Sequence, residues 1–248
     1  DEPGICLMFR PRAAGDRHIC LPMILSGNAG CIVQLVTREE TATLVRSFVP
    51  FLRVFLQETA PVLEAKRLME NLRESTLRDA MTGLYNRRFI EAYMETLVAS
   101  VKRRNTHLAI LMLDVDHFKK VNDTHGHDAG DRVLIAVAKA VKLTLRASDM
   151  VVRYGGEEFI VFLQDTDGEG GVVAAEKIRS AIEGLRIPLE HGNISKTISV
   201  GVADFPSDGS DFWDVVKFAD AALYAAKDRG RNRVVRFTPD LWQDGSQS

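Results

Sequence analysis

Two aspartates at the end of an apolar run are the first residues whose types and positions could do chemistry. Asp114 continues the apolar run 108–113, and Asp116 follows two positions later. An isolated aspartate more often caps a helix or forms a turn, but a carboxylate inside a buried strand is costly unless it is paired or bound to metal. Carboxylate oxygens suit Mg²⁺, which takes one or two protein carboxylates together with substrate phosphates. The pattern therefore predicts a metal site at a solvent-facing edge of a sheet.

A second acidic pair follows a glycine doublet. Gly155 and Gly156 separate two apolar runs, which predicts a two-residue hairpin turn with positive φ. This turn accounts for the glycines but not for Glu157 and Glu158, which open the second run. Neighbouring strand residues face opposite sides, so we expect one glutamate on each face, and the glycines leave room for a ligand near the backbone. If this strand lies beside the one that contains Asp114, the carboxylates can share metal ions.

Carboxylates in this arrangement favour phosphoryl chemistry. Metal ions beside a nucleoside triphosphate stabilise the charge that develops during in-line attack on a phosphate, and a sugar hydroxyl activated by a glutamate can be the nucleophile. The chain contains no P-loop, GxSxG, protein-kinase or HExxH motif, which excludes several other enzyme classes. The net charge of −2 argues against broad binding to DNA or RNA, so any nucleotide should be small and held in a local pocket.

An α/β (α+β) domain at 77–238 must position these residues. Its apolar patterns predict a β-α-β-β-α-β core, the split βαβ arrangement, in which helices flank a central sheet that contains antiparallel strands. The run 108–113 predicts a central strand that is buried on both faces. The predicted elements are helix 87–104, strand 107–114, helix 128–146, strand 150–154, strand 158–164, helix 170–186, strand 196–204, helix 211–228 and strand 232–237.

The region 1–38 predicts a strand hairpin that belongs to a larger domain. Apolar runs at 19–25 and 31–36 flank a Gly-rich turn, and two strands alone are marginal, so the hairpin needs partners that precede it. The chain also begins with Asp1 rather than Met, which favours a fragment of a longer protein.

The region 39–76 predicts an amphipathic helical linker. Pro50 and Pro61 should kink or divide it. Beyond Pro61, apolar residues alternate at spacings of three and four, which predicts a parallel coiled coil that joins two copies of the chain. Packing of the helix against its own domain is the alternative. The seam positions are Val62, Ala65, Met69, Leu72 and Thr76.

Composition and cysteine content favour a cytoplasmic protein. No apolar run approaches the ~18 residues needed to span a bilayer, and residues 1–15 lack the pattern of a signal peptide. Cys6, Cys20 and Cys31 form no CxxC pair and no zinc-site spacing, so we expect buried free thiols in a reducing compartment. Residues 239–248 are expected to be a disordered tail.

Five motifs in order resemble the GGDEF domain of diguanylate cyclases. The signature is the pentapeptide 155–159 in its GGEEF form, and the resemblance extends over Asp79–Phe237. Met81 replaces the usual leucine of the first motif. The other four motif segments are 79–88 (DAMTGLYNRR), 114–123 (DVDHFKKVND), 126–131 (GHDAGD) and 225–232 (AAKDRGRN).

This resemblance implies a palm-like fold and a specific reaction. The family condenses two GTP molecules into cyclic di-GMP, a bacterial second messenger, and releases two pyrophosphates. Two Mg²⁺ or Mn²⁺ ions per active site are implied as cofactors. Because one domain holds one GTP, two domains must meet, so the resemblance also implies a homodimer. The implied metal ligands are Asp114, the Val115 carbonyl, Glu157 and Glu158.

The family's other roles transfer position by position. Glu157 would deprotonate the 3′-hydroxyl, with Glu158 as a further catalytic residue. Asn122 and Asp131 would recognise guanine, and His127 would line the base pocket or serve in packing. The remaining implied substrate contacts are Gly155, Gly156, the catalytic Lys119, Lys227 and Arg231.

Two further resemblances concern regulation. Arg146 and Asp149 alone predict a weak surface ion pair, but an RxxD sequence five residues before the first signature glycine resembles the family's inhibitory site for cyclic di-GMP. Lys177 and Arg179 on the next helix would support that site. In the region 1–38, the strings CLP and GCIVQL resemble the closing hairpin of a GAF sensory domain.

Three other functions remain as alternatives at this point. A degenerate domain could sense GTP or cyclic di-GMP without making it, the domain could act only in dimerisation, or a related cyclase could use one substrate and release a 3′,5′-cyclic mononucleotide. The sequence names neither the signal sensed nor the direction of regulation, and it leaves open how Glu157 and Glu158 divide their roles.

Overall fold

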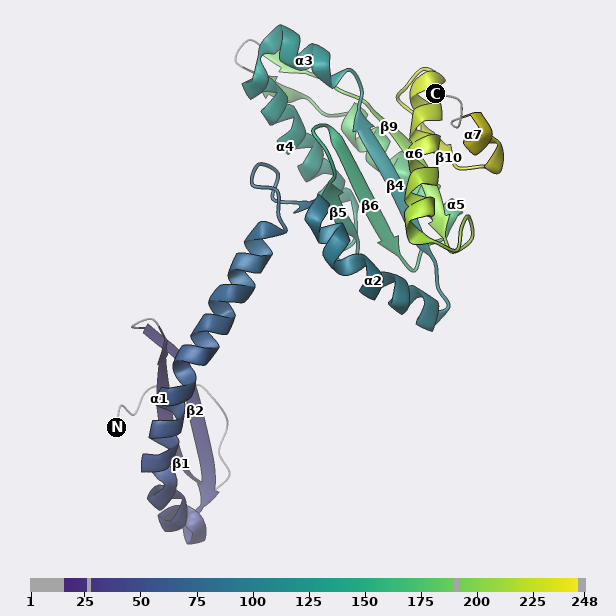
Figure 1. Cartoon of the computed structure of the whole chain (residues 1–248). Coiled ribbons are helices and arrows are strands. Elements are labelled where there is room, and N and C mark those ends of the chain that lie inside the picture. Colours follow the sequence, from purple (N-terminus) through teal and green to yellow (C-terminus); the bar gives the residue numbers. More distant parts are fainter. Residues whose placement is uncertain (1–15, 26–27, 190–191, 245–248) are drawn as a thin grey trace. The chain divides into compact units, whose positions relative to one another are not determined.

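The chain is described by a computed structural model over residues 16–25, 28–189 and 192–244 (Figure 1). Its contacts divide it into two compact units, Asp1–Ser75 and Thr76–Ser248. The smaller unit contains the predicted hairpin and most of the predicted linker helix, and the larger unit contains the predicted α/β domain.

The N-terminal unit consists of a hairpin followed by a long helix. Strand β1 (Asp16–Leu25) pairs antiparallel with β2 (Asn28–Arg38), and α1 (Glu39–Thr76) follows directly. The predicted hairpin is confirmed. Both prolines lie inside one continuous α1, so of the two predicted effects the division of the helix is wrong, and the kink stays a prediction. Each proline removes one helical hydrogen bond, and the helix continues on both sides of it.

Cys20 in β1 is disulfide-bonded. The prediction of free thiols is therefore wrong for this residue, because an odd number of cysteines still allows one pair. Cys6 and the side chain of Cys31 lie outside the described part of the chain. Among the described residues, no helix has the length and apolar character needed to cross a membrane.

A six-stranded mixed sheet forms the core of the C-terminal unit (Figure 1). The strand order is β10-β9-β4-β6-β5-β3, with β4 antiparallel to both of its neighbours. The predicted β-α-β-β-α-β order is confirmed. The strands are β3 (Tyr85–Asn86), β4 (Leu108–Val115), β5 (Met150–Arg153), β6 (Glu158–Gln164), β9 (Ile198–Phe205) and β10 (Val234–Arg236).

Helices cover both faces of this sheet, so all eight residues of β4 are buried. Ala109, Leu111 and Leu113 belong to one apolar cluster with residues of α4 and α5, whereas Ile110 and Met112 belong to another with residues of α2 and α6. This alternation follows from the period of two along a strand. The helices are α2 (Arg87–Arg104), α3 (Phe118–His125), α4 (His127–Thr144), α5 (Gly168–Glu183) and α6 (Phe212–Asp228).

The alternation also sets which face the acidic residues share. Asp114 lies two and four positions after Met112 and Ile110, so it points to the same face of the sheet as they do. Glu158 lies two positions before Ile160, which belongs to the same apolar cluster. Both carboxylates therefore belong to the face of the sheet that α6 covers.

The structure contains elements that the sequence patterns did not predict. These are α3, the short strand β3 and a separate hairpin of β7 (Ile187–Leu189) and β8 (Gly192–Ile194). Residues 239–244 form α7 (Pro239–Asp244), so the prediction of a disordered tail is wrong for this segment. Trp242 of α7 packs edge-on against Phe218 of α6, which anchors the segment to the domain. Residues 245–248 lie outside the described part.

Candidate active site

The β4–β6 pairing brings the predicted acidic residues together. Asp114 and Glu158 are direct partners in the register of the two strands. The two strands that carry the carboxylates are therefore neighbours, which is the condition for a shared metal site. Asp114 has a side chain only 8% exposed, and Lys227 Nζ lies 2.8 Å from its Oδ2. Lys227 comes from α6, so the helix supplies a cation to the carboxylate beneath it.

The acidic edge consists of Asp114, Glu157 and Glu158, and the charge of Asp114 disfavours the charge of both glutamates. Burial raises the pKa of Asp114, and the hydrogen bond and charge of Lys227 oppose that rise. Burial also raises the pKa of Glu157 and of Glu158, and the charge of Asp114 raises both further. Crowded carboxylates with raised pKa values favour the approach of a positive ion.

The signature loop leaves space where a side chain would otherwise stand. A Cβ on Gly155 would lie 2.7 Å from Glu158 Oε2, whereas a Cβ on Gly156 would meet nothing within 4 Å. The backbone N–H of Val115 donates to the Glu157 carbonyl at 3.3 Å, which joins the loop to the end of β4. Gly155 therefore makes room for a catalytic candidate, and Gly156 presents open backbone.

The conformation expected for these glycines is not the one observed. Neither Gly155 nor Gly156 has a positive φ. The loop spans residues 154–157 between β5 and β6, and this longer connection does not need the left-handed turn of a two-residue hairpin.

Arg153 and Asp79 hold this loop from outside. Arg153 Nη2 donates to the Gly156 carbonyl at 2.8 Å, and Arg153 Nη1 donates to Asp79 Oδ1 at 3.1 Å. Burial alone would raise the pKa of Asp79, but hydrogen bonds from Thr82 and Arg153 outweigh it and lower the pKa below its usual value. The first family motif thus supports the signature loop, a role that spacing alone did not reveal.

Asn122 presents an acceptor without a donor. Its Oδ1 is buried, and within the described part of the chain no group hydrogen-bonds to it. A Cβ on Gly130 would lie 2.0 Å from this oxygen, so the glycine of α4 is what allows Asn122 its place on α3. Asp131, next in α4, is exposed, as is His127 in the first turn of the same helix. A buried acceptor left unpaired is costly, which favours a ligand that donates here.

The predicted phosphate-binding cations come from two parts of the domain, α3 and the end of α6. Lys119 is exposed in the first turn of α3, whose N-terminal N–H groups suit an anion. Arg231 follows α6, and its Nη1 donates to the Lys227 carbonyl at 3.4 Å. The charges of Lys227 and Arg231 both lower the pKa of Asp114 against the effect of burial.

The predicted inhibitory residues divide into two groups. The N–H of Arg146 donates to Asp149 Oδ2 at 3.0 Å, which closes a compact turn with the Arg146 side chain exposed. Lys177 is exposed on α5. Arg179 instead forms ion pairs with Glu176 and Glu183, each at 2.8 Å. The structure therefore commits the Arg179 guanidinium to a different network.

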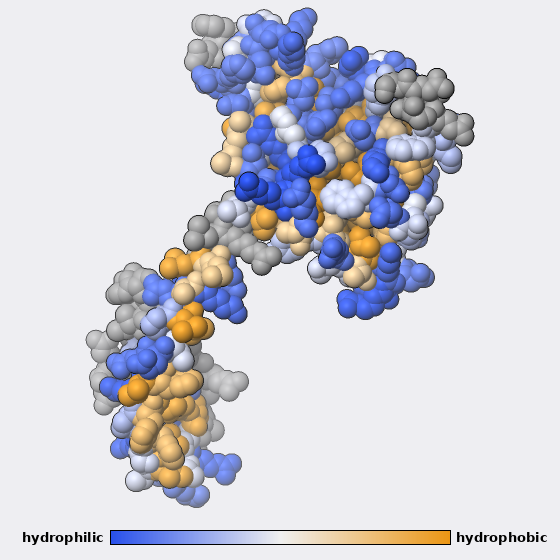
Figure 2. Space-filling view, in the orientation of Figure 1, coloured by the Kyte–Doolittle hydropathy of each residue, from blue (hydrophilic) through white to orange (hydrophobic). Residues whose placement is uncertain are grey.

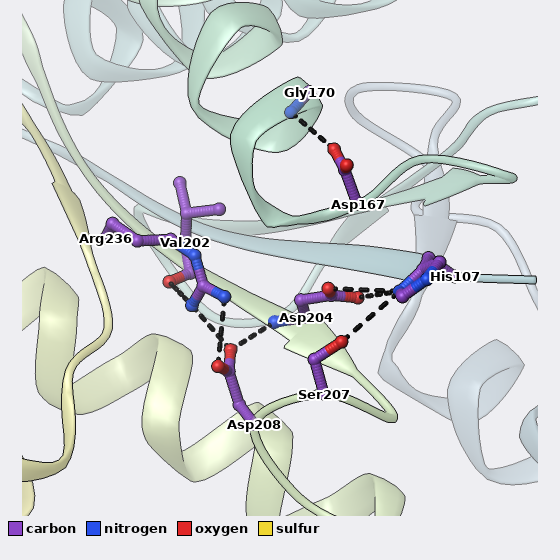
Figure 3. Close-up of polar contacts among 8 residues, drawn as sticks. All are labelled: His107, Asp167, Gly170, Val202, Asp204, Ser207, Asp208 and Arg236. Carbon is purple, nitrogen blue, oxygen red and sulfur yellow. Dashed lines mark hydrogen bonds and ion pairs between the residues drawn. The ribbon is translucent and has the colours of Figure 1, made fainter.

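A polar cluster at the other end of β4 has the residue types of a hydrolase triad but not its geometry (Figure 3). Asp204 Oδ2 lies 3.2 Å from His107 Nδ1, and Ser207 Oγ lies 3.3 Å from the same nitrogen. In a Ser-His-Asp triad the serine and the aspartate contact different ring nitrogens. The cluster therefore carries no nucleophile, and the chemistry remains at the Asp114 edge.

No group of three His, Cys, Asp or Glu side chains that could hold a metal ion occurs in the described part of the chain. The donor set nevertheless fits Mg²⁺. Asp114, Glu157 and Glu158 offer hard oxygen atoms, and Mg²⁺ needs only one or two protein carboxylates when substrate phosphates complete its shell.

Comparison with known proteins decides the family. The family model described as "Diguanylate cyclase, GGDEF domain" matches residues 76–233. The chain belongs to the GGDEF diguanylate cyclase family. It is 38% identical over 180 residues to the "Probable diguanylate cyclase DgcC" of Escherichia coli (strain K12), covering 73% of this chain and 47% of that protein. It is 42% identical over 167 residues to "Diguanylate cyclase A" of Treponema denticola, covering 66% of this chain and 45% of that protein.

Solved GGDEF structures share the fold. The coiled coil and GGDEF domain of DgcB from Caulobacter crescentus, in complex with c-di-GMP, aligns with a TM-score of 0.67 and 29% identity over 75% of this chain and 98% of that one. The active GGEEF domain of a diguanylate cyclase from Vibrio cholerae aligns with a TM-score of 0.58 and 35% identity, covering 62% of this chain and 97% of that one. The chain spans less than half the length of the two curated relatives above.

Proposed function

We propose that the C-terminal unit is a diguanylate cyclase that condenses two GTP molecules into cyclic di-GMP and releases two pyrophosphates. The observation that carries this proposal is the pairing of Asp114 with Glu158 across β4 and β6, with Lys227 at 2.8 Å from Asp114. Family membership supplies the reaction, and the intact acidic edge favours an active enzyme over a degenerate sensor.

Two Mg²⁺ or Mn²⁺ ions are proposed as cofactors. Asp114, the Val115 carbonyl, Glu157 and Glu158 would hold them. When bound, such ions neutralise the triphosphate and stabilise the charge that develops at the α-phosphate.

The chain's own residues would orient the substrate and move the proton. Glu157, whose pKa is raised by burial and by Asp114, is the proposed base for the 3′-hydroxyl. Asn122 would accept from guanine through its unpaired Oδ1, with Asp131 beside it. Such a site rejects adenine, which would leave the buried acceptor unpaired. The cations proposed to bind the triphosphate are Lys119, Lys227 and Arg231.

A second copy of the chain is proposed to pack along α1. The heptad spacing extends from the predicted seam back to Leu44, because Leu44, Phe48, Phe51 and Phe55 keep the alternation of three and four. One position of this register, between Phe55 and Val62, is the charged Glu58. Large apolar side chains on this stripe are exposed, including Phe51 at 73% and Met69 at 70%. Figure 2 shows apolar residues gathered on the N-terminal unit, where Figure 1 places α1. A parallel coiled coil would cover this stripe.

Regulation is proposed at two places in the chain. Arg146, Asp149 and Lys177 would bind cyclic di-GMP as an inhibitor, because Arg146 is exposed and can fork onto a phosphate or a guanine edge. The hairpin of residues 1–38 is proposed to be the last part of a GAF-like sensory domain, with α1 as the linker to the cyclase.

Product identity tests this function. Purified protein is incubated with GTP and Mg²⁺, and the nucleotides are separated by chromatography. We expect cyclic di-GMP from the wild type and from Glu169→Gln, an exposed control on α5, but not from Glu157→Gln. A 3′,5′-cyclic mononucleotide would support the single-substrate cyclase instead. GTP binding without any product would support a sensor.

A further inference from the structure

Three consecutive left-handed residues follow the helix that carries Lys227. Gly230, Arg231 and Asn232 have φ values of 108°, 62° and 47°. Glycine adopts such values freely, but they are unfavourable for residues with a Cβ, so Arg231 and Asn232 must be held there by their surroundings. The segment belongs to the last family motif, in which no role has yet been given to Asn232.

Both ends of the Asn232 amide are anchored to α5. Arg179 Nη1 donates to Asn232 Oδ1 at 2.8 Å, and Asn232 Nδ2 donates to Glu183 Oε1 at 2.7 Å. Arg179 is itself fixed by its ion pairs with Glu176 and Glu183. The Asn232 side chain is therefore held by a cluster of Arg179, Glu176 and Glu183 on α5.

The backbone of Asn232 is anchored to a buried carboxylate just past the end of β4. Asn232 N–H donates to Asp116 Oδ2 at 3.1 Å. Asp116 is only 2% exposed, and its carboxylate also accepts from Thr197 Oγ1 and Ser199 Oγ, each at 2.7 Å. These three donors link the end of β4 to the start of β9 and to the left-handed turn. They satisfy the buried carboxylate with protein groups.

The turn sets where the preceding cations stand. The Arg231 N–H donates to the Ala226 carbonyl at 3.0 Å, and Arg231 Nη1 donates to the Lys227 carbonyl at 3.4 Å. Arg231 therefore folds back over the last turn of α6, beside the lysine that pairs with Asp114. In an extended conformation, Arg231 would leave this position.

We propose that Asn232 and Asp116 are positioning residues that lock the left-handed turn and so aim Arg231 and Lys227 at the substrate phosphates, with Arg179 as the outer anchor. This inference rests on the proposed function, because it assigns the phosphates to Arg231 and Lys227. It gives Asp116 a structural task, although it lies two residues from a metal-ligand candidate, and it gives Arg179 a task at the active site rather than at the inhibitory site.

The test is a double-mutant cycle between Asn232 and Arg231. Asn232→Ala should raise the KM for GTP about tenfold and change kcat by less than about threefold, because it loosens ground-state contacts to phosphate. In an Arg231→Ala background, the same substitution should raise KM by less than about twofold, since the group that it positions is gone. Asn193→Ala, an exposed asparagine on β8, is the control and should leave KM unchanged.

An unchanged KM in Asn232→Ala, or an equal effect with and without Arg231, would overturn the inference. Circular dichroism and thermal unfolding check that each variant folds. If Asn232→Ala does not fold, Asn232→Gly repeats the test, because glycine accepts the left-handed φ while it removes both side-chain bonds. The Kd for GTP is measured by calorimetry in parallel. A wild type that binds GTP without making cyclic di-GMP would refute the proposed function, yet the Kd values would still test the positioning.

Discussion

At the scale of single residues, the ionised carboxylates of the acidic edge lower the stability of the folded, ligand-free protein. Burial and the charge of Asp114 raise the pKa of Glu157. At a pH between the unfolded and the folded pKa, the folded, ligand-free protein therefore keeps a proton that the unfolded chain has already released. The stabilising effect of this proton is complete below the unfolded pKa and is lost as the pH rises through the raised folded pKa. At neutral pH the site therefore carries electrostatic strain that a cation would relieve.

Glu157→Gln should consequently stabilise the ligand-free protein. In the presence of a chelator at pH 7, we expect its unfolding midpoint to rise by about 1 to 3 °C, because one crowded charge is removed. Near pH 4 the difference should vanish, since Glu157 is then protonated. Calorimetric unfolding across this range checks both points, with Glu169→Gln as the control. A lower unfolding midpoint for Glu157→Gln at pH 7 would show that the charge of Glu157 does not destabilise the ligand-free protein.

The role of Gly130 is steric, because the absence of a side chain leaves room for Asn122. Gly130→Ala would place a Cβ 2.0 Å from Asn122 Oδ1, so Asn122 must leave its position. We expect GTP binding to weaken by at least about tenfold, as expected when an oriented buried hydrogen bond is lost. Calorimetric titration with GTP measures this. Gly184→Ala, whose nearest new contact is 3.5 Å, should bind GTP like the wild type, and equal binding by both variants would refute the assignment of Asn122.

At the scale of elements, the packing of α6 on β9 fixes Lys227 over Asp114. Gly201 of β9 lies so close to α6 that a Cβ would stand 2.0 Å from the Ala219 carbonyl and 2.2 Å from the Leu223 nitrogen. Both contacts are backbone atoms, which cannot rotate away. The helix reaches the carboxylate edge because this strand residue has no side chain.

Gly201→Ala should therefore both destabilise the domain and impair the site. We expect a loss of about 2 to 3 kcal/mol in the free energy of unfolding, in the range for overpacking of a core. Urea unfolding measures it. Gly156→Ala, where a Cβ meets nothing within 4 Å, is the matched control and should unfold like the wild type. Equal stability of the two variants would show that α6 can move away without cost.

Long periodic elements could be predicted from the sequence, whereas short ones could not. Helix 87–104 is observed at the predicted bounds, where the Asn86 side chain accepts from the Arg88 N–H at its start. The eight-residue α3 was missed because its N-cap residue His117 is left-handed and makes no side-chain cap. The hairpin of β7 and β8 has only three residues in each strand, too few for a pattern of period two.

The candidate site divides in the same way. Asp114 and Glu158 could be placed together because strand parity and pairing follow from apolar runs. The Asp116 network could not, since Thr197, Ser199 and Asn232 lie far from it in sequence and only the sheet brings them together.

At the scale of the whole molecule, the proposed reaction requires two active sites, and α1 is the element proposed to pair them. Its exposed apolar stripe from Leu44 to Met69 follows one heptad register within a single helix, interrupted by one charged seam position, Glu58. Linking two catalytic domains through such a helix raises the effective concentration of one site near the other.

Phe51→Glu should separate the copies. The new charge would add to Glu58 within the seam and replace a large apolar contact, so we expect the dimer to dissociate at micromolar concentration and the turnover per chain to fall at least about tenfold. Analytical ultracentrifugation and activity on dilution measure these effects. Gln57→Glu adds the same charge at an exposed position outside the seam and should leave both unchanged. A fully dimeric, active Phe51→Glu protein would place the dimer contact elsewhere.

Phosphorus NMR of a GTP reaction is the direct test that two copies of this acidic edge together condense two GTP molecules. Pyrophosphate and the product phosphodiester are followed together in the presence of Mg²⁺. The account predicts two pyrophosphates for each cyclic di-GMP from the wild type, and neither signal from Glu157→Gln. One pyrophosphate for each cyclic mononucleotide, or product formation that survives Glu157→Gln, would contradict it.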